Sequence, residues 1–363
     1  MDMKPYIKKI VLLLLITGAA FFIGRTNAFL YEDTIGKVIS IDTKLDTKKM
    51  ENSHSNEKMY VQTIRLKILN GDRLGEVVET TNNFTETTAS SEHYRLFDQV
   101  FVELVSKDKT YITGVKRDWV LLTCLAVFIT LAVLIGKKKG TMALLSIAFN
   151  VMIVLVALPY IIKHNHWLII SILCATLFSI TSFLCIHGFN KISLSGLLGT
   201  AVSTLVSVGI AVLTISCIHQ NTLDYDQMEY LTTIPAERIF MMEIIIGGLG
   251  AIIDIANTMN TVVREFCLQN ADLSPKELWQ AGMDAGKDVM GTMANVLFFV
   301  FLAGSIPQFV LWVSNQVGVG EVLKYLLSLE LARALIGGIS VVLSIPISLY
   351  IAIAVQKGAY KWQ

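Results

Sequence analysis

Apolar residues in this chain come in long, nearly unbroken runs. A helix needs roughly 20 mainly apolar residues to cross a bilayer, and eight runs reach or approach that length. They lie near residues 8–24, 118–136, 141–162, 167–187, 194–219, 238–258, 289–312 and 331–355. The pattern predicts an all-α polytopic membrane bundle of about eight transmembrane helices.

The polar stretch from about 31 to 113 has a different pattern. In "IRLKI", Ile64, Leu66 and Ile68 alternate with Arg65 and Lys67, which is the period of a strand with one wet face. "NGD" at 70–72 predicts a turn before the next strand, and further strands are expected at 34–41, 98–106 and 110–115. Five short strands predict a small β-barrel of the OB type, inserted after the first helix.

Composition and charge set the class and the topology. With 53% hydrophobic and 16% charged residues, the chain is too apolar for a soluble domain. Lysines precede the first run and follow the second, fourth and eighth, so positive flanks place both termini in the cytoplasm and residues 31–113 outside. The expected domains are a signal-anchor helix (1–30), an extracytoplasmic β-rich domain (31–116) and a seven-helix membrane domain (117–363). The alternative is that the first run is a cleaved signal peptide.

Polar residues within the last three runs fall into stripes. Positions three, four, seven and eleven apart share a helix face, and each of these runs has one small and polar face. The members are Glu243, Gly247, Gly250, Asp254 and Asn257 in the sixth run, Asp284, Asp288, Gly291 or Thr292 and Asn295 in the seventh, and Arg333, Gly337, Ser340 and Ser344, below Glu330, in the eighth. Before the seventh run, "SPKE" predicts a capping box at Ser274 and Glu277.

Depth along the helices suggests which of these residues meet. Glu243, Glu330 and Arg333 form a candidate outer ion pair, and Asp254 matches Asp288 or Asn295 in depth. An intramembrane carboxylate costs about 3 kcal/mol and is by default a functional hypothesis, so the candidate polar site is Asp254, Asn257, Asp288, Thr292 and Asn295. The purely structural interpretations are an ion pair, or side chains that snorkel to the headgroups, for Glu243 and Arg333 at the membrane edge. For the aspartates the structural interpretation is hydrogen bonding between helices. The glycines, Gly247, Gly250, Gly291 and Gly337, are expected to be helix-packing positions.

Other chemistry has little support. His164, His166 and His219 fall near one side of the third to fifth runs and are a weak candidate metal group, and no cofactor is expected. The chain lacks the His-Glu-x-x-His and Gly-x-x-x-x-Gly-Lys motifs, and the paired motifs of GxGD-type intramembrane proteases are absent as well, so an enzyme is not expected and an intramembrane hydrolase is the minor alternative. The β-domain does not interleave aromatic and basic residues on one face, as a nucleic-acid-binding surface would, so no nucleic-acid partner is expected.

Three segments resemble the signature segments of the YibE/F family of bacterial multi-pass membrane proteins. They are "GLGAIIDIANTMNTVVRE" (249–265), "GMDAGKDVMGTMANVLFFVFLAGSIPQ" (282–308) and "LELARALIGGISVVLSIPIS" (329–348). The resemblance implies a bacterial cytoplasmic membrane location and carries over these matching positions: Asp254, Asp288, Gly291, Thr292, Asn295, Glu330, Arg333 and Pro346. The asparagines in "IANTMN" depart from the family pattern.

Two functions follow from these observations. The first is a permease or transporter for a small ion or solute, with a polar path through the last three long runs. The alternative is a non-transporting scaffold whose β-domain binds an envelope partner, and whose polar stripes hold helices or a homo-oligomer together. Membrane lipid is the only partner common to both.

Overall fold

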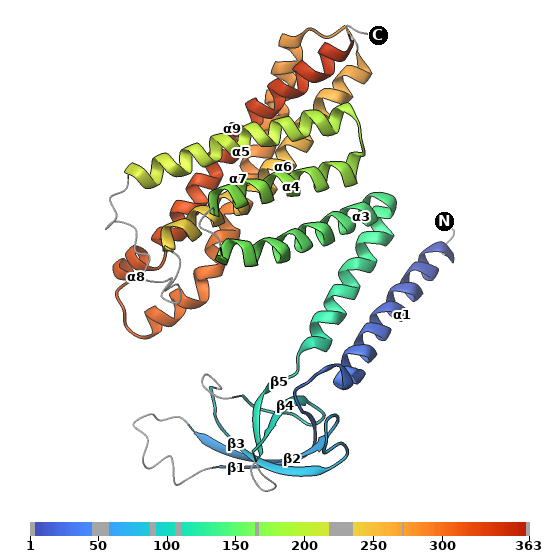
Figure 1. Cartoon of the computed structure of the whole chain (residues 1–363), viewed down its shortest axis with the longest axis vertical. Helices are drawn as coiled ribbons and strands as arrows, with labels where there is room; N and C mark the ends of the chain where they lie inside the picture. The colour runs from blue at the N-terminus through green and yellow to red at the C-terminus, as the bar shows by residue number, and fades with distance from the viewer. Residues whose placement is uncertain are drawn as a thin grey trace. The chain divides into compact units, whose positions relative to one another are not determined.

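A computed structural model of the 363-residue chain describes residues 4–45, 58–87, 92–105, 110–163, 167–217, 235–270 and 272–360. The chain divides into two compact units, residues 1–140 and 141–363. The first unit holds α1 (Lys4–Thr26), the short 3-10 helix η1 (Asn27–Leu30), five strands and the first part of α3 (Asp118–Lys163). The second holds the rest of α3 and the remaining helices (Figure 1).

The strands of the first unit form one antiparallel sheet. In chain order they are β1 (Ile35–Leu45), β2 (Met59–Ile68), β3 (Val77–Thr85), β4 (Gln99–Leu104) and β5 (Thr110–Val115), and their order in the sheet is β3-β2-β1-β4-β5. The two edge strands approach each other, and the Thr80 hydroxyl on β3 donates to the carbonyl of Thr110 on β5 at 2.6 Å. The sheet is therefore a nearly closed, OB-like barrel, as predicted.

The barrel interior is filled by the apolar side chains that alternate along the strands. Its buried core is Val38, Ile64, Leu66, Ile68, Val78, Tyr94, Val100 and Val102. Gly71 has a φ of 81°, so the predicted turn is present. Asn70 has a further role, because its side chain accepts a bond from Ile35 N at 2.6 Å and donates to the carbonyls of Tyr31 and Asp33.

A buried lysine joins the barrel to the two helices beside it. The Lys116 ammonium is fully buried and donates to Gly24 O at 2.6 Å, Asn27 Oδ1 at 2.7 Å and Asp118 Oδ1 at 2.7 Å. Asp118 Oδ2 accepts from Asn27 Nδ2 and from the Tyr31 hydroxyl. Burial, together with this carboxylate, raises the pKa of Tyr31 above its usual value and keeps the hydroxyl a donor. The network links α1, η1, β5 and α3.

The helices α1 and α3 also pack closely at this junction. A Cβ on Gly24 would lie 2.5 Å from Trp119 Cα, so only glycine permits this approach. The Arg25 guanidinium lies 4.7 Å from the Trp119 ring centroid and 5.7 Å from that of Phe21, and it donates to Phe97 O at 2.8 Å. Cation–π contacts and the hydrogen bond therefore hold the end of α1 against both the barrel and α3.

The second unit, residues 141–363, which we call the membrane unit, is built around α6 and α9. Its elements after α3 are α4 (Trp167–His187), α5 (Lys191–Cys217), α6 (Ala236–Gln269), α7 (Pro275–Ser314), α8 (Val319–Tyr325) and α9 (Ser328–Tyr360). The main core cluster joins α6, α7 and α9 through residues that include Met259, Leu278, Leu297, Ile345 and Leu349. The predicted capping box at Ser274 and Glu277 is confirmed at the start of α7.

The described residues contain seven helices long and apolar enough to cross a membrane. The predicted runs 118–136 and 141–162 are the two helical segments of α3, which meet at a kink at Lys137, where φ is 49°. Six further predicted runs correspond to α1, α4, α5, α6, α7 and α9, so the predicted class of a polytopic helical bundle with a β-barrel after its first helix is confirmed. The short helix α8 was not predicted.

Candidate functional site

One ion-pair cluster joins α6 to α9 near the start of both helices. The Arg333 guanidinium donates to Glu330 Oε2 at 2.6 Å and to Glu243 Oε2. Its side chain is only 12% exposed, and the rings of Phe240 and Phe301 lie 5.5 and 5.6 Å from it. The three charged residues matched by depth in the sequence are thus in contact, in an arrangement that fixes the register of α6 against α9.

The Asp254 carboxylate is an unpaired charge within the apolar part of α6. It lies near the middle of this 34-residue helix, and its side chain is exposed, with no hydrogen bond or ion pair to any residue within the described ranges. Thr258 and Thr261 lie on the same flank, and their hydroxyls bond to backbone carbonyls one turn earlier. A Cβ on Gly250 would meet nothing within 4 Å. This flank of α6 is therefore both polar and open.

Asn257 turns away from that flank toward α4. Its Oδ1 lies 2.5 Å from Nε2 of His187, the last residue of α4. The contact ties the end of α4 to α6 next to Asp254, so His187 joins the candidate polar residues. Its position at the end of an apolar run made it indistinguishable from a flanking residue in the sequence.

The polar stripe of α7 points away from the core of the membrane unit. The buried residues of this helix include Leu278, Gly282, Gly286 and Leu297, whereas Asp284, Asp288, Gly291, Thr292 and Asn295 are exposed. Asp288 and Asn295 lie nine and two residues from Leu297, which places both on the opposite side of a 3.6-residue helix. The structure therefore gives Asp254 no contact with Asp288, Thr292 or Asn295.

The four glycines differ in their surroundings. A Cβ on Gly247 would lie 3.0 Å from the Phe301 ring, and one on Gly337 would contact Phe301 and Leu297. At Gly250 and Gly291 the same atom would meet nothing within 4 Å. Gly247 and Gly337 lie at helix contacts, whereas Gly250 and Gly291 border open space.

A second polar feature, of which the sequence stripes contained only Ser340 and Ser344, is buried between α5, α6 and α9. Small residues recur every four positions and meet antiparallel, Ser195, Gly199, Ser203 and Ser207 on α5 with Ser340, Ser344 and Ser348 on α9; we call this set the serine seam. Ser340 donates to Ser207 at 2.7 Å, and Ser195 donates to the fully buried Asn260 on α6. The buried hydroxyls of Thr200, Ser203, Thr204 and Ser348 have no partner among the described residues.

The histidines 164, 166 and 219 lie outside the described residues, so the proposed metal group among them stays a prediction. Within the described residues, no group of three or more His, Cys, Asp or Glu side chains is arranged to hold a metal ion.

The architecture defines a class: a multi-pass membrane protein with a small β-barrel after its first helix. Two family profiles match this chain, that of the YibE/F-like protein over residues 124–358 and that of the YibE/F family N-terminal domain over residues 29–117. The chain belongs to the YibE/F family. No curated protein and no solved structure matched it.

Proposed function

We propose that this protein is a permease of the bacterial cytoplasmic membrane that moves a small cation, or a solute together with protons. In this proposal both termini are cytoplasmic and the barrel is external. The observation that carries the proposal is the unpaired Asp254 carboxylate in the middle of a long apolar helix. An intramembrane carboxylate faces either a water-filled cavity or another charged group.

The surroundings of Asp254 support a water-lined path along α6. Gly250, Thr258 and Thr261 make the same flank small and polar, and Asn257 with His187 supplies a polar edge. The outward stripe of α7 is not required for this path. Asp254 is the proposed ion-binding group, and the hydroxyl and amide side chains beside it are the proposed lining.

Flux through the purified protein tests the proposal directly. Proteoliposomes that contain a pH-sensitive dye are given a K⁺ gradient and valinomycin to drive protons, and the assay is repeated with a Na⁺ gradient. We expect the wild type to conduct one of these ions and Asp254→Asn to fall to the level of protein-free liposomes. Asp284→Asn is the matched control, because Asp284 is exposed on α7 and pairs with Lys287 at 2.7 Å. Flux retained in a folded Asp254→Asn protein would contradict the proposed role.

Water access to the α6 flank can be measured independently of the substrate. The five native cysteines are replaced, and single cysteines at positions 254, 258 and 261 are treated with a water-soluble, membrane-impermeant thiol reagent. We expect all three to react, and we expect Leu213→Cys, at an apolar position that is 65% exposed, to stay unlabelled. Equal protection at all four positions would exclude a water-lined flank.

A second function, that of a scaffold, is favoured by one feature of the barrel unit. A cleft of about 850 Å³ is lined by residues that include Tyr60, Phe84, His93, Arg95 and Arg117. The Tyr60 and Phe84 rings stack with centroids 5.2 Å apart, which presents an aromatic surface for a ligand or partner. In the scaffold case, Tyr60→Ala/Phe84→Ala removes crosslinking to that partner while Asp254→Asn leaves it intact. The reverse result would favour the permease.

A further inference from the structure

A groove separates the start of α7 from the end of α9. Its volume is about 640 Å³, and it is lined by Pro275, Lys276, Trp279, Gln280, Tyr350, Ile353, Ala354 and Lys357. Nothing in the proposed permease path uses these residues. The groove has two basic side chains, two amphipathic aromatic side chains and an aliphatic wall.

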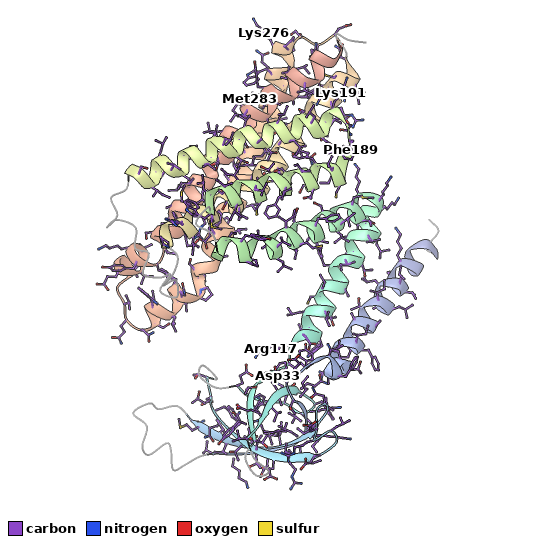
Figure 2. All side chains as sticks on the ribbon, in the orientation of Figure 1. Asp33, Arg117, Phe189, Lys191, Lys276 and Met283 are labelled. Carbon is purple, nitrogen blue, oxygen red and sulfur yellow. The ribbon has the colours of Figure 1, made fainter. Side chains whose placement is uncertain are left out.

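Contacts between α7 and α9 show how far along the two helices each residue of the groove lies. The Lys357 ammonium donates to the carbonyl of Leu273, just before α7 begins. About two turns deeper, a Cβ on Gly282 would contact the side chain of Leu349. Because α7 and α9 run antiparallel at this point, Lys276 and Lys357 lie at the end of the groove nearest the helix termini, which we call its outer level. Tyr350 lies nearer the middle of the bundle. Figure 2 shows Lys276 at the end of the membrane unit and Met283 further along α7.

The wall formed by α9 continues the apolar surface of the membrane unit. Ile339, Leu343 and Tyr350 on this helix are 49%, 38% and 67% exposed, and Ala354 is also exposed. Such a surface is in contact with acyl chains when the helix crosses a bilayer. Tyrosine and tryptophan side chains prefer the level of the lipid headgroups, so Tyr350 and Trp279 mark that level inside the groove.

Two of the acidic residues near the groove, Glu277 and Asp284, are engaged elsewhere, and Asp272 is exposed just before the start of α7. Glu277, which lies close enough to interact with Lys357, accepts a bond from Ser274 N at 2.7 Å in the capping box. Asp284 is paired with Lys287. Lys276 is exposed on the first turn of α7, and Lys357 bonds to a neutral carbonyl. The outer level of the groove therefore presents two positive charges above an apolar wall.

We propose that this groove binds the headgroup of an anionic phospholipid. The lipid phosphate lies between Lys276 and Lys357, the glycerol region contacts Trp279 and Tyr350, and one acyl chain follows Ala354 and the exposed face of α9. The charge selects anionic over zwitterionic headgroups, because a basic residue at a membrane surface attracts anionic lipid.

Lipid titration of the full-length protein tests this site. Delipidated wild-type protein in a non-ionic detergent is titrated with phosphatidylglycerol or with phosphatidylcholine, and binding is followed by native mass spectrometry. We expect a preference for phosphatidylglycerol, and we expect Lys276→Gln to weaken its binding roughly fivefold, which corresponds to about one basic residue, without changing phosphatidylcholine binding. Lys276 makes no structural bond in the described residues, so this variant should fold normally.

Two controls separate a built site from general charge attraction. Lys138→Gln removes an exposed lysine near the break in α3 and should leave the lipid preference unchanged. In a protein whose single tryptophan is Trp279, phosphatidylglycerol with brominated acyl chains should quench the fluorescence, and Lys276→Gln should reduce the quenching. Equal binding of both lipids, an unchanged preference in Lys276→Gln, or equal thermal stabilisation by inorganic phosphate would each overturn the proposal.

Discussion

Replacement of Lys116 by methionine is expected to destabilise the barrel and its junction with α1 and α3 by about 3–5 kcal/mol, the usual cost of removing one partner of a buried ion pair. Methionine has nearly the same length but donates no hydrogen bond. Gly24 O and Asn27 Oδ1 would lose a donor, and Asp118 would keep only the neutral donors Asn27 Nδ2 and the Tyr31 hydroxyl.

Thermal unfolding of the full-length protein in detergent measures this effect. The apparent midpoint should fall by on the order of 10 °C. Lys67→Met is the matched control, because Lys67 is exposed on β2 and its loss should have little effect. Adding Asp118→Asn to Lys116→Met should recover part of the stability, since it removes the uncompensated negative charge. A Lys116→Met protein as stable as Lys67→Met would show that the network contributes little.

The second large effect is expected in the serine seam. A Cβ on Gly199 would lie 3.1 Å from Ser348 Oγ and 3.4 Å from Ser348 Cα, so Gly199→Leu would push α5 away from the backbone of α9. Overpacking of this kind typically costs about 1–3 kcal/mol, and the separation would also weaken the bonds from Ser340 to Ser207 and from Ser195 to Asn260.

Gly209→Leu provides a control on the same helix, because a Cβ there would meet nothing within 4 Å. We expect Gly199→Leu to unfold at a clearly lower temperature in detergent and to elute as aggregate in size-exclusion chromatography, whereas Gly209→Leu should resemble the wild type. If both variants behave alike, the close approach of α5 and α9 at Gly199 does not hold the unit together.

Much of the fold could be predicted because long apolar runs and strict alternation are local signals. The alternation around Ile64 to Ile68 predicted β2, and Ser274 with Glu277 predicted the start of α7. The runs on either side of Lys137 were predicted as separate helices, because Lys137 to Lys139 interrupt the apolar sequence. The non-helical backbone at Lys137, which separates two helical segments, agrees with this prediction.

The candidate site was less predictable, because facing depends on packing between helices. The stripe of Asp288, Thr292 and Asn295 follows from helical spacing alone, but its direction depends on Gly282, Gly286 and Leu297, which pack α7 onto its neighbours. Serines cost little in an apolar helix, so the four-residue repeat on α5 did not stand out. Lys116 was not singled out in the sequence, and only three-dimensional contacts show that it is buried.

The Lys116 network bears on how the barrel can be studied in isolation. Sequence similarity to the YibE/F family N-terminal domain covers residues 29–117, a range that contains the lysine but none of its three acceptors, Gly24, Asn27 and Asp118. A fragment cut at those limits would leave the Lys116 ammonium without its three protein acceptors. The smallest fragment that folds on its own should therefore reach from the last turn of α1 into the first turn of α3. The limits of the matched family domain and the limits of the stable folding unit thus differ in this protein.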